Sequence, residues 1–595
     1  STRDLARELR LLRDRVAAEE SGFRKAVPEP QPRFASAFIA GGLALLVFIV
    51  GFVFLGKERE ATGTSAASTP ATKTKKYLAV TQFKDLSGDP NGQLVVDGFA
   101  ETLSARLAHY PSVQVMRPPA APEAAPEDVR KVARDLGANL VLTGSMMRNG
   151  DRIRVTYSVV DAKSGREWRD LVEGNVANLF SVQDDVADSV ARNLALGASR
   201  PRPTLDPAVS QRRYLEAVGH LRRYDSEQSL DSAIAILSEL GQSPSVQAAL
   251  ARAYMYKFEI SGDSRFAAAG SDAAQRAFAA DPQSIDVNLT TGELRRRTGR
   301  YDEAVDAFMR VLSQQPNNAD AVLGLAETYK AAGDFRRAEQ SYKRAIALQP
   351  NYWSGYNKLG VFYYVQGRYE DAIPLFRKVT ELVPDNQRGY NNLGAMYQRL
   401  GRFDEAVRTF ARSIALEPSA SGYSNLGTSY YFAGRYAEAA AAFDEAVKIA
   451  PQAFLYWRNL GDAYRWVPGR EQNARRAFER AVALCDAAIR VNPNDASAFA
   501  SRASALAKLG RHREARAAIL RALELEPRDP TRVYEAAVIA NLAGSEDDAL
   551  ARLEQAMRLG FNPNDVERDP EVANLMKSGR LQKIVQDFRT SSTKK

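Results

Sequence analysis

The sequence has very little cysteine and histidine. Its 595 residues include one cysteine, Cys485, and three histidines, His109, His220 and His512. A single cysteine excludes an intrachain disulfide and a cysteine-rich metal cluster, and the histidines are too scattered in the sequence to indicate a metal site. We therefore predict neither a metal ion nor a cofactor.

The sequence also lacks a large excess of charge and the motifs of phosphate-transferring enzymes. There are 81 basic and 72 acidic residues, so the net charge of +9 is small for the length and does not indicate nucleic-acid binding. The turn "LSGDPNG" has glycines without the Lys-Ser/Thr pair of a phosphate-binding loop, and neither "HRD" nor "DFG" occurs. No catalytic residues are predicted, and the chain itself is predicted not to be an enzyme.

One stretch lacks charge altogether. Residues 35–56, "ASAFIAGGLALLVFIVGFVFLG", contain no charged side chain and are long enough to cross a hydrocarbon core of about 30 Å as a helix. A signal peptide would have a shorter apolar core, and a soluble buried helix is seldom this long. The sequence predicts a transmembrane helix at 35–56, preceded by a juxtamembrane helix and proline-rich spacer at 1–34 and followed by a linker at 57–76.

The flanks and the glycines of the predicted span bear on its orientation and packing. Within about twenty residues there are four basic residues before the span and five after it, so the positive-inside rule does not decide the orientation. Gly41, Gly42 and Gly51 would let two spans pack closely, which makes a homodimer through the span a candidate.

Residues 77–197 show the pattern of a small mixed domain. "YLAVTQF" alternates like a half-buried strand, and helical patterns follow at 93–109 and 126–137. Three further strands are expected after residue 139, with hairpin turns at Asn149-Gly150 and Ser164-Gly165. A closing helix completes the predicted order β-α-β-α-β-β-β-α.

The same part of the chain resembles the TolB-like amino-terminal domain of bacterial membrane receptors. The resemblance rests on "FKDLSGDP", "DGFAETLSARLAHYPSVQVM", "RDLGANLVLTGSMMRNGDRIRVTYSVVDAKSG" and "LFSVQDDVA". Gln82 stands where such domains usually carry proline. The resemblance implies a small α+β TolB-like domain at 77–197.

Prolines recur at a constant spacing in the rest of the chain. The series comprises Pro282, Pro316, Pro350, Pro384 and Pro418. In phase with them run "YNKLGVFYYVQGRYEDAIPLF", "YNNLGAMYQRLGRFDEAVRTF" and "YSNLGTSYYFAGRYAEAAAAF". The constant spacing, a period of about 34 residues, and the pattern in phase with it closely resemble tetratricopeptide repeats. We therefore predict an all-α solenoid of these repeats at 206–590, with atypical units at both ends.

One repeat is longer than the others. The interval from Pro451 to Pro493 exceeds the period of the series, yet both helical halves of the unit are present. We expect its second helix to be longer by about two turns, with Cys485 inside that extension as a small packing residue.

Arrays of this kind bind peptides or proteins along the concave face formed by the first helix of each repeat. We therefore expect a protein or peptide partner in this groove. Superposing the repeats in phase places these candidate groove residues on that face: Asn357, Tyr364, Arg388, Asn391, Gln398, Arg399, Tyr431, Arg458, Asp462 and Arg465.

The first fifteen residues, "STRDLARELRLLRDR", form an apolar helical stripe. The stretch resembles the last helix of bacterial serine/threonine protein kinase domains. Together with the predicted span, the TolB-like domain and the repeats, it resembles the outer portion of bacterial receptor-like kinases. This implies a kinase domain before Ser1 in a longer parent, with the kinase domain missing from this chain.

The predicted fold class is therefore multidomain: one transmembrane helix, a small α+β domain and an all-α superhelix. The predicted function is a membrane-anchored sensing and protein-binding module of a bacterial signalling receptor. It would sit in the bacterial inner membrane with residues 57–595 outside the cytoplasm. Two alternatives stay open: a stand-alone scaffold of the cell envelope, and the outer portion of an adenylate cyclase or a transcriptional regulator.

Overall fold

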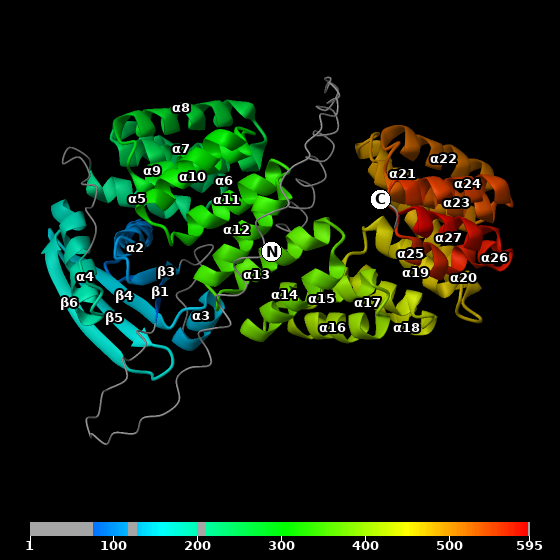
Figure 1. The fold of residues 1–595 in the computed structure, drawn as a ribbon, viewed down its shortest axis with the longest axis horizontal. Helices are drawn as coiled ribbons and strands as arrows, with labels where there is room; N and C mark the ends of the chain where they lie inside the picture. The colour runs from blue at the N-terminus through cyan, green and yellow to red at the C-terminus, as the bar shows by residue number, and fades with distance from the viewer. Residues whose placement is uncertain (1–74, 117–127, 199–209, 593–595) are drawn as a thin grey trace, which may run out of the picture. The chain divides into compact units, whose positions relative to one another are not determined.

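The computed structural model describes residues 75–116, 128–198 and 210–592. The predicted juxtamembrane segment 1–34, the predicted span 35–56 and nearly all of the linker 57–76 lie outside these ranges. The described chain begins with a small sheet region and continues as a long array of helix pairs (Figure 1).

The sheet runs in the order β3-β1-β4-β5-β6, and the two-residue strand β2 also pairs with β4. β1 is parallel to β3 and β4, whereas β4, β5 and β6 form an antiparallel meander. The strands are β1 (Lys76–Val80), β2 (Lys84–Asp85), β3 (Val113–Met116), β4 (Leu140–Asn149), β5 (Arg152–Asp161) and β6 (Glu167–Asn175). The helices of this region are α2 (Gly92–Leu107), α3 (Val129–Leu136) and α4 (Leu179–Asn193).

The predicted element order of this region is confirmed, with β2 as an addition. Both predicted hairpins are present, and each turn contains a glycine in the left-handed region, Gly150 at φ +60° and Gly165 at φ +71°. Gln82, the departure from the TolB-like pattern, is buried and donates a hydrogen bond from Nε2 to the buried Asp97 carboxylate at 2.9 Å. The resemblance to TolB-like domains stays a prediction.

The helix pairs follow from the periodic proline, cap and glycine positions. In the central repeats a proline follows the end of one pair, and a polar N-cap then begins the next. Asn386, for example, accepts a hydrogen bond from the Gly389 N–H at 2.9 Å. The helices are α5 (Gln211–Leu221), α6 (Glu227–Glu239), α7 (Pro244–Ser261), α8 (Ser264–Ala280), α9 (Ile285–Arg297), α10 (Tyr301–Gln314), α11 (Ala319–Ala331), α12 (Phe335–Leu348), α13 (Trp353–Val365), α14 (Tyr369–Leu382), α15 (Gln387–Arg399), α16 (Phe403–Leu416), α17 (Ala420–Phe432), α18 (Tyr436–Ile449), α19 (Phe454–Tyr464), α20 (Glu471–Val491), α21 (Ala496–Lys508), α22 (His512–Leu525), α23 (Pro530–Leu542) and α24 (Glu546–Arg558).

In several central repeats, a glycine of the first helix packs on a phenylalanine of the second helix. A Cβ added to Gly394 would lie 2.9 Å from the Phe410 ring, and one added to Gly360 would lie 2.8 Å from the Phe376 ring. Both phenylalanines are buried. The small residue is therefore required by the helix crossing, which confirms the predicted repeat register.

The long repeat has the expected extension. Its second helix, α20, has 21 residues, against 14 in the equivalent helix α18. Cys485 is fully buried within α20, and burial raises the pKa of its thiol to about 12. The prediction of a longer helix with Cys485 as a packing residue is confirmed.

The sheet region and the first helices of the array share one hydrophobic core, and α2 lies between the sheet and α5 (Figure 1). Gly98 of α2 contacts the backbone of Leu215 in α5, and Gly219 of α5 contacts the backbone of Leu94 in α2. A Cβ at either glycine would overlap the facing carbonyl, so the two helices approach closely only because both positions are glycine.

Successive turns of the array also meet the sheet region. Tyr352, in the turn before α13, packs in a cluster with Tyr77 and Ala79 of β1. In the equivalent turn of the next repeat, the Asp385 carboxylate pairs with the Lys131 ammonium of α3 at 2.7 Å. These two turns are one repeat apart, so the period of the array brings both of them to the same sheet region.

Past the last helix pair, the chain continues as α25 (Pro563–Arg568), the short 3₁₀ helix η2 (Pro570–Val572), α26 (Ala573–Lys577) and α27 (Arg580–Ser592). Val566, Val572 and Leu581 are buried in one cluster with residues of α23 and α24. This C-terminal part therefore covers the end of the array, as the prediction of an atypical terminal unit requires.

The predicted fold class and location need correction. Among the described residues, no helix is both long enough and apolar enough to cross a membrane. The helices of the array are short and amphipathic, and the longest of them, α20, carries charged side chains along its length. The described chain is mostly helical, a superhelix of paired helices with a small N-terminal sheet. The expectation of a single-pass inner-membrane protein with a homodimer through its span is not carried forward.

Candidate functional site

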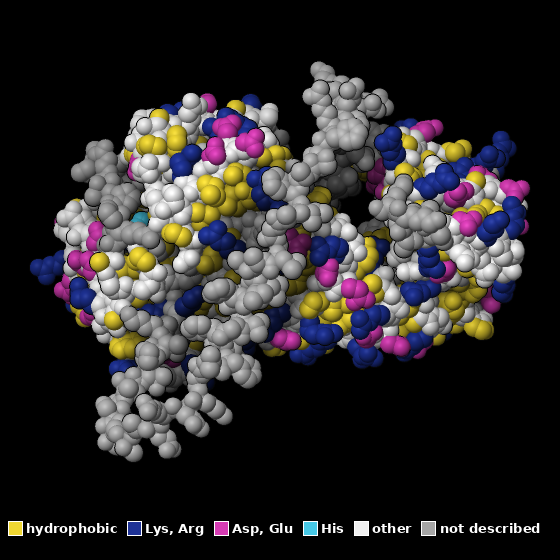
Figure 2. Space-filling model, viewed as in Figure 1, with side chains coloured by type: hydrophobic (Ala, Val, Ile, Leu, Met, Phe, Trp, Pro, Cys, Tyr) yellow, Lys and Arg dark blue, Asp and Glu magenta, His cyan; other side chains and the backbone are white. Residues whose placement is uncertain are grey.

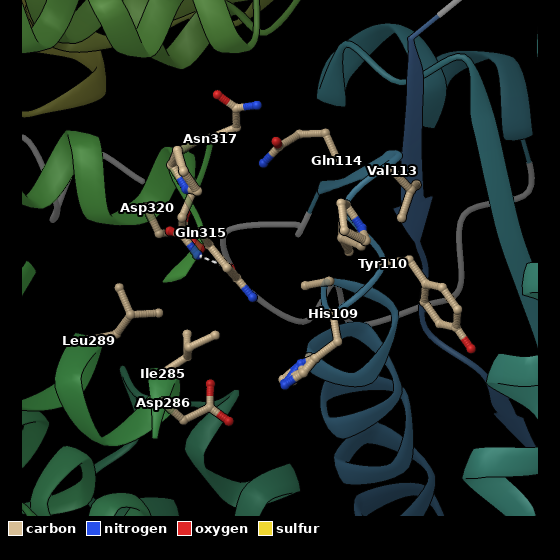
Figure 3. Close-up of a pocket in the computed structure, with 17 residues that line it drawn as sticks. His109, Tyr110, Val113, Gln114, Ile285, Asp286, Leu289, Gln315, Asn317 and Asp320 are labelled. Atoms are coloured by element: carbon tan, nitrogen blue, oxygen red, sulfur yellow. Dashed lines mark hydrogen bonds between the residues drawn. The ribbon is translucent and has the colours of Figure 1, made fainter. Parts of the chain in front are cut away.

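A small cavity lies between the sheet region and two turns of the array. Its volume is about 100 Å³, and Figure 3 shows His109, just after α2, and Asp286, at the start of α9, on either side of it. Gln315 and Asp320 line it from the turn before α11 and the start of that helix. The space would hold only a few water molecules, each of which takes about 30 Å³. Within the described ranges, no group of three or more His, Cys, Asp or Glu side chains could hold a metal ion.

A larger cavity of about 290 Å³ lies on the face of the array formed by the first helices of its later repeats. Side chains from α17, α19, α21 and α23 converge on it, and residues from the C-terminal part close one side. Its lining consists of Thr428, Tyr431, Phe432, Phe443, Arg458, Asn459, Asp462, Ser504, Lys508, Thr531, Tyr534, Glu535, Val538, Phe561, Asp569 and Glu571.

The spacing of residues along each first helix explains this lining. Arg458 and Asp462 stand at positions i and i+4, so they share one face of α19, whereas Leu460 and Ala463 are buried on the side that packs within the array. Each first helix therefore has one face fixed by packing and a second face free to carry polar groups.

The charges at the cavity are paired and largely buried. Arg458 pairs with Glu535 at 3.1 Å, and Lys508 pairs with Asp462. Glu571 lies 2.6 Å from the Arg465 guanidinium and 3.6 Å from the Lys508 ammonium. Only 5% of the Lys508 side chain is exposed. A partner that engages these charged residues must therefore exchange charge pairs.

The pKa values of the two C-terminal acidic residues that line the cavity, Asp569 and Glu571, shift in opposite directions. Burial raises the pKa of Asp569 to about 6, an effect partly offset by the hydrogen bond it accepts from the Tyr534 hydroxyl at 2.6 Å. Burial also disfavours the charge of Glu571, but the charges of Lys508 and Arg465 outweigh it and hold the pKa of Glu571 below its usual range.

Five of the ten predicted groove residues lie at the cavity or against the C-terminal part. Tyr431, Arg458 and Asp462 line the cavity. Arg465 binds Glu571 at its edge, and the Arg399 guanidinium lies 3.9 Å from the Asp565 carboxylate.

The other five predicted residues lie on the first helices of two earlier repeats, α13 and α15, outside the cavity lining. Asn357 accepts a hydrogen bond from Asn392 at 3.0 Å, and Asn391 accepts one from Asn425 at 3.2 Å. Gln398 donates to the Ser429 hydroxyl at 3.1 Å. The Tyr364 ring packs 5.8 Å from the Tyr369 ring, and Arg388 is exposed. Their role in binding a peptide stays a prediction.

Several cavity residues were not among those predicted. Lys508 stands two positions before Gly510, as Arg399 stands two before Gly401, so the repeat register contained a signal for it. Glu535 and Tyr534 lie in the last repeat, where the pattern is weak. Asp569 and Glu571 follow the repeats altogether, and no periodic signal places them.

Comparisons with known proteins agree on the repeats. A family model described as tetratricopeptide repeat matches residues 289–329, 323–387, 424–489 and 469–531, and a second model with that description matches 386–452. The putative adenylate cyclase 3 of Rhizobium meliloti (strain 1021) is 30% identical over 141 residues, which are 23% of this chain and 24% of that protein. The chain thus spans about a quarter of the length of this relative.

Three solved structures match parts of this chain. The MamA protein is 25% identical with a TM-score of 0.27, over 29% of this chain and 94% of that one. YrrB, described as a TPR protein with an unusual peptide-binding site, is 19% identical with a TM-score of 0.27, over 31% and 96%. A tetratricopeptide repeat protein from Parabacteroides merdae ATCC 43184 is 16% identical with a TM-score of 0.35, over 45% and 98%.

The family matches, the glycine–phenylalanine crossings and the paired helices lead to the same assignment. From residue 289 to residue 531, this chain is an array of tetratricopeptide repeats.

Proposed function

We propose that the chain is a protein-binding scaffold and that a segment of a partner protein binds on the first-helix face of α15–α23. The observation that carries this proposal is the cavity of about 290 Å³, where side chains of four successive repeats converge on one space. Tetratricopeptide arrays with such a face are a protein-binding architecture, and their solenoid geometry gives an extended concave surface.

The lining supports a peptide rather than a small polar metabolite. Tyr431 and Phe432 offer aromatic surface, while Arg458 and Asp462 offer charges of opposite sign within about one turn of helix. A polypeptide carries apolar side chains, charged side chains and backbone amides together, and so matches this mixture. On the face that Figure 2 shows, basic and acidic side chains are interspersed along the repeats, so selectivity is better explained by the groove than by a broad charged patch.

The test compares a groove variant with a matched variant outside the groove. The groove variant is Asn391→Ala/Arg399→Ala/Arg465→Ala. The control, Asn494→Ala/Arg475→Ala/Arg558→Ala, removes the same side-chain types at exposed positions of α20, α24 and the turn before α21, away from the first helices. Quantitative mass spectrometry after cross-linking in a native cell extract is expected to recover partners with the wild type and the control and to lose them with the groove variant. Equal recovery of partners by all three proteins would show that the groove does not bind them.

A second proposal is that the scaffold serves a signalling enzyme. The similarity to a putative adenylate cyclase favours a nucleotide cyclase, whereas the resemblance of residues 1–15 to the end of a kinase domain favours a serine/threonine protein kinase. The full-length product of the gene, incubated with labelled ATP and Mg²⁺, separates the two. Formation of cyclic AMP supports the cyclase, and transfer of phosphate to protein supports the kinase. If the product shows neither activity, the stand-alone scaffold is the alternative that fits.

A further inference from the structure

The residues that follow the last helix pair return to the face proposed to bind the partner. Residues 562–572, here called the tail segment, comprise α25, η2 and their flanks. The Asn562 side-chain amide donates to the Arg399 carbonyl at the end of α15. At the other end of the tail segment, the Glu571 carbonyl accepts a hydrogen bond from Asn541, at the end of α23, at 2.7 Å. The tail segment therefore spans the first-helix face of five successive repeats.

The contacts of the tail segment with this face are carried by complementary charges. Asp565 faces Arg399 of α15, and Glu571 faces both Arg465, just after α19, and Lys508 of α21. The Arg568 guanidinium lies 5.5 Å from the centre of the Phe403 ring, a cation–π contact. Two of the cations that the tail segment engages, Arg399 and Arg465, are residues that the repeat pattern assigns to the partner.

The remainder of the C-terminal part provides a separate attachment. Leu581 and Val585 of α27 are buried against α23 and α24 in the cluster that also holds Val566 and Val572. Val566 and Val572 are themselves part of the tail segment, so lifting it from the groove breaks the contacts of Asp565 and Glu571 and also exposes these two valines. Leu581 and Val585 keep α27 packed on α23 and α24, so the tail segment stays attached to the array.

We propose that the tail segment is an internal competitor of the partner: it occupies the groove in the unbound chain and is displaced when the partner's own acidic segment takes over Arg399, Arg465 and Lys508. This inference rests on the proposed function and adds the chemistry of the partner, an extended segment with carboxylates spaced like Asp565 and Glu571. Because the competitor is covalently attached, its effective concentration is high, and the partner binds only when its contacts exceed those of the tail segment.

The test uses a fluorescein-labelled peptide of residues 560–574 and the full chain. In the variant Asp565→Lys/Glu571→Lys, the tail segment carries lysines opposite Arg399, Arg465 and Lys508, and repulsion is expected to vacate the groove. The peptide should then bind this variant with a Kd about tenfold or more below that for the wild type, measured by fluorescence anisotropy. A peptide in which the same two positions are Asn and Gln should bind neither protein.

The matched control is Glu554→Lys/Glu567→Lys, which makes the same change of charge. Glu567 is on α25 but pairs with Arg589, and Glu554 pairs with Arg558, so neither contacts the groove cations. The control should bind the peptide as weakly as the wild type does. Equal peptide affinity for the wild type, the control and the groove-vacating variant would overturn the inference.

A second measurement covers the case in which the lysine variant does not fold. In the milder variant Asp565→Asn/Glu571→Gln, hydrogen exchange at residues 562–572 should be faster than in the wild type, while exchange in α27 should be unchanged. Unchanged exchange at 562–572 would contradict the inference. If the peptide and exchange tests fail while Asn391→Ala/Arg399→Ala/Arg465→Ala still loses its partners, the proposed function stands without the competitor.

Discussion

The two ends of the repeat array make different kinds of contact with the segments that cover them. At the N-terminal end, the sheet region meets the array through a shared apolar core and through the backbone contact of Gly98 with Leu215. At the C-terminal end, residues 562–572 meet the first-helix face through charge pairs such as Glu571 with Arg465, and Val566 and Val572 are buried with residues of α23 and α24. A shared apolar core with close backbone contact is typical of a permanent junction within a folded unit, whereas the charge pairs at the C-terminal end are contacts that a partner with the same charges can replace.

The difference follows from which surface of the repeat is used. The turns and the terminal helix α5 present backbone and small side chains, so a neighbour can approach closely. The first helices present one polar face, because their other face is committed to packing on the second helices. The same repeating unit therefore supports a fixed attachment at one surface and a binding site at another.

The largest effect is expected from breaking the N-terminal junction. Gly98→Leu would place a side chain against the backbone of Leu215, where even a Cβ overlaps, so α2 and α5 must separate. We expect a loss of about 3–4 kcal/mol in the free energy of unfolding and a correspondingly lower Tm of the full chain. Ala235→Leu, at an exposed position of α6, is the control and should leave the Tm unchanged. Equal melting of both variants would mean that the close approach of α2 and α5 does not exist in solution.

A smaller effect is expected inside a single repeat. Gly394→Leu would press on the buried Phe410 ring and overpack the crossing of α15 and α16 by about 1–3 kcal/mol. Thermal melting of the full chain should show a lower midpoint than that of Ala411→Leu, which lies on the exposed side of α16. An unchanged midpoint for Gly394→Leu would show that the repeat register is wrong.

The smallest effect concerns the pH dependence of the C-terminal contact. The pKa of Asp569 is about 6, above its usual value of 3.8, so the folded state binds a proton that the unfolded chain releases between these values. Asp569 is surrounded by Tyr534 of α23, Glu571 of η2 and Lys508 of α21. Its contribution to stability is present below about pH 4 and is lost as the pH rises through 6.

Asp569→Asn removes this titration. Relative to the wild type, the variant should gain about 2 kcal/mol of stability between pH 4 and pH 7, because the wild type loses its favourable protonated form over that range. Melting of both proteins at several pH values measures the difference. A constant difference between the two proteins across this range would show that Asp569 does not titrate near pH 6.

The sequence was informative wherever a pattern repeats. The proline spacing predicted the helix pairs, the longer interval between Pro451 and Pro493 predicted the extension of α20, and Asn149-Gly150 predicted the hairpin between β4 and β5. Each of these predictions depends on local turn residues or on the length of a single helix pair, and both can be read from a short stretch of sequence. Arg458 and Asp462 could be placed at the site for the same reason.

The rest depends on contacts between segments distant in the sequence. Residues 562–572 carry no repeat pattern, so their return to Arg399 and Arg465 could not be read from the sequence. The turns before α13 and α15 resemble the other turns, and nothing in them marks a docking surface for β1 and α3. The predicted span at 35–56 rested on hydropathy alone and falls outside the described residues, whereas the helices that the structure describes are amphipathic and none could cross a membrane.

The central claim is that the contact at the C-terminal end is exchangeable and the junction at the N-terminal end is not. Native-state hydrogen exchange of the full chain, followed by mass spectrometry, compares the two directly. The account predicts that amides at 562–572 exchange about a hundredfold faster, after correction for sequence, than amides at the α2–α5 junction, residues 94–107 and 211–221. Protection at 562–572 equal to that of the junction would contradict it.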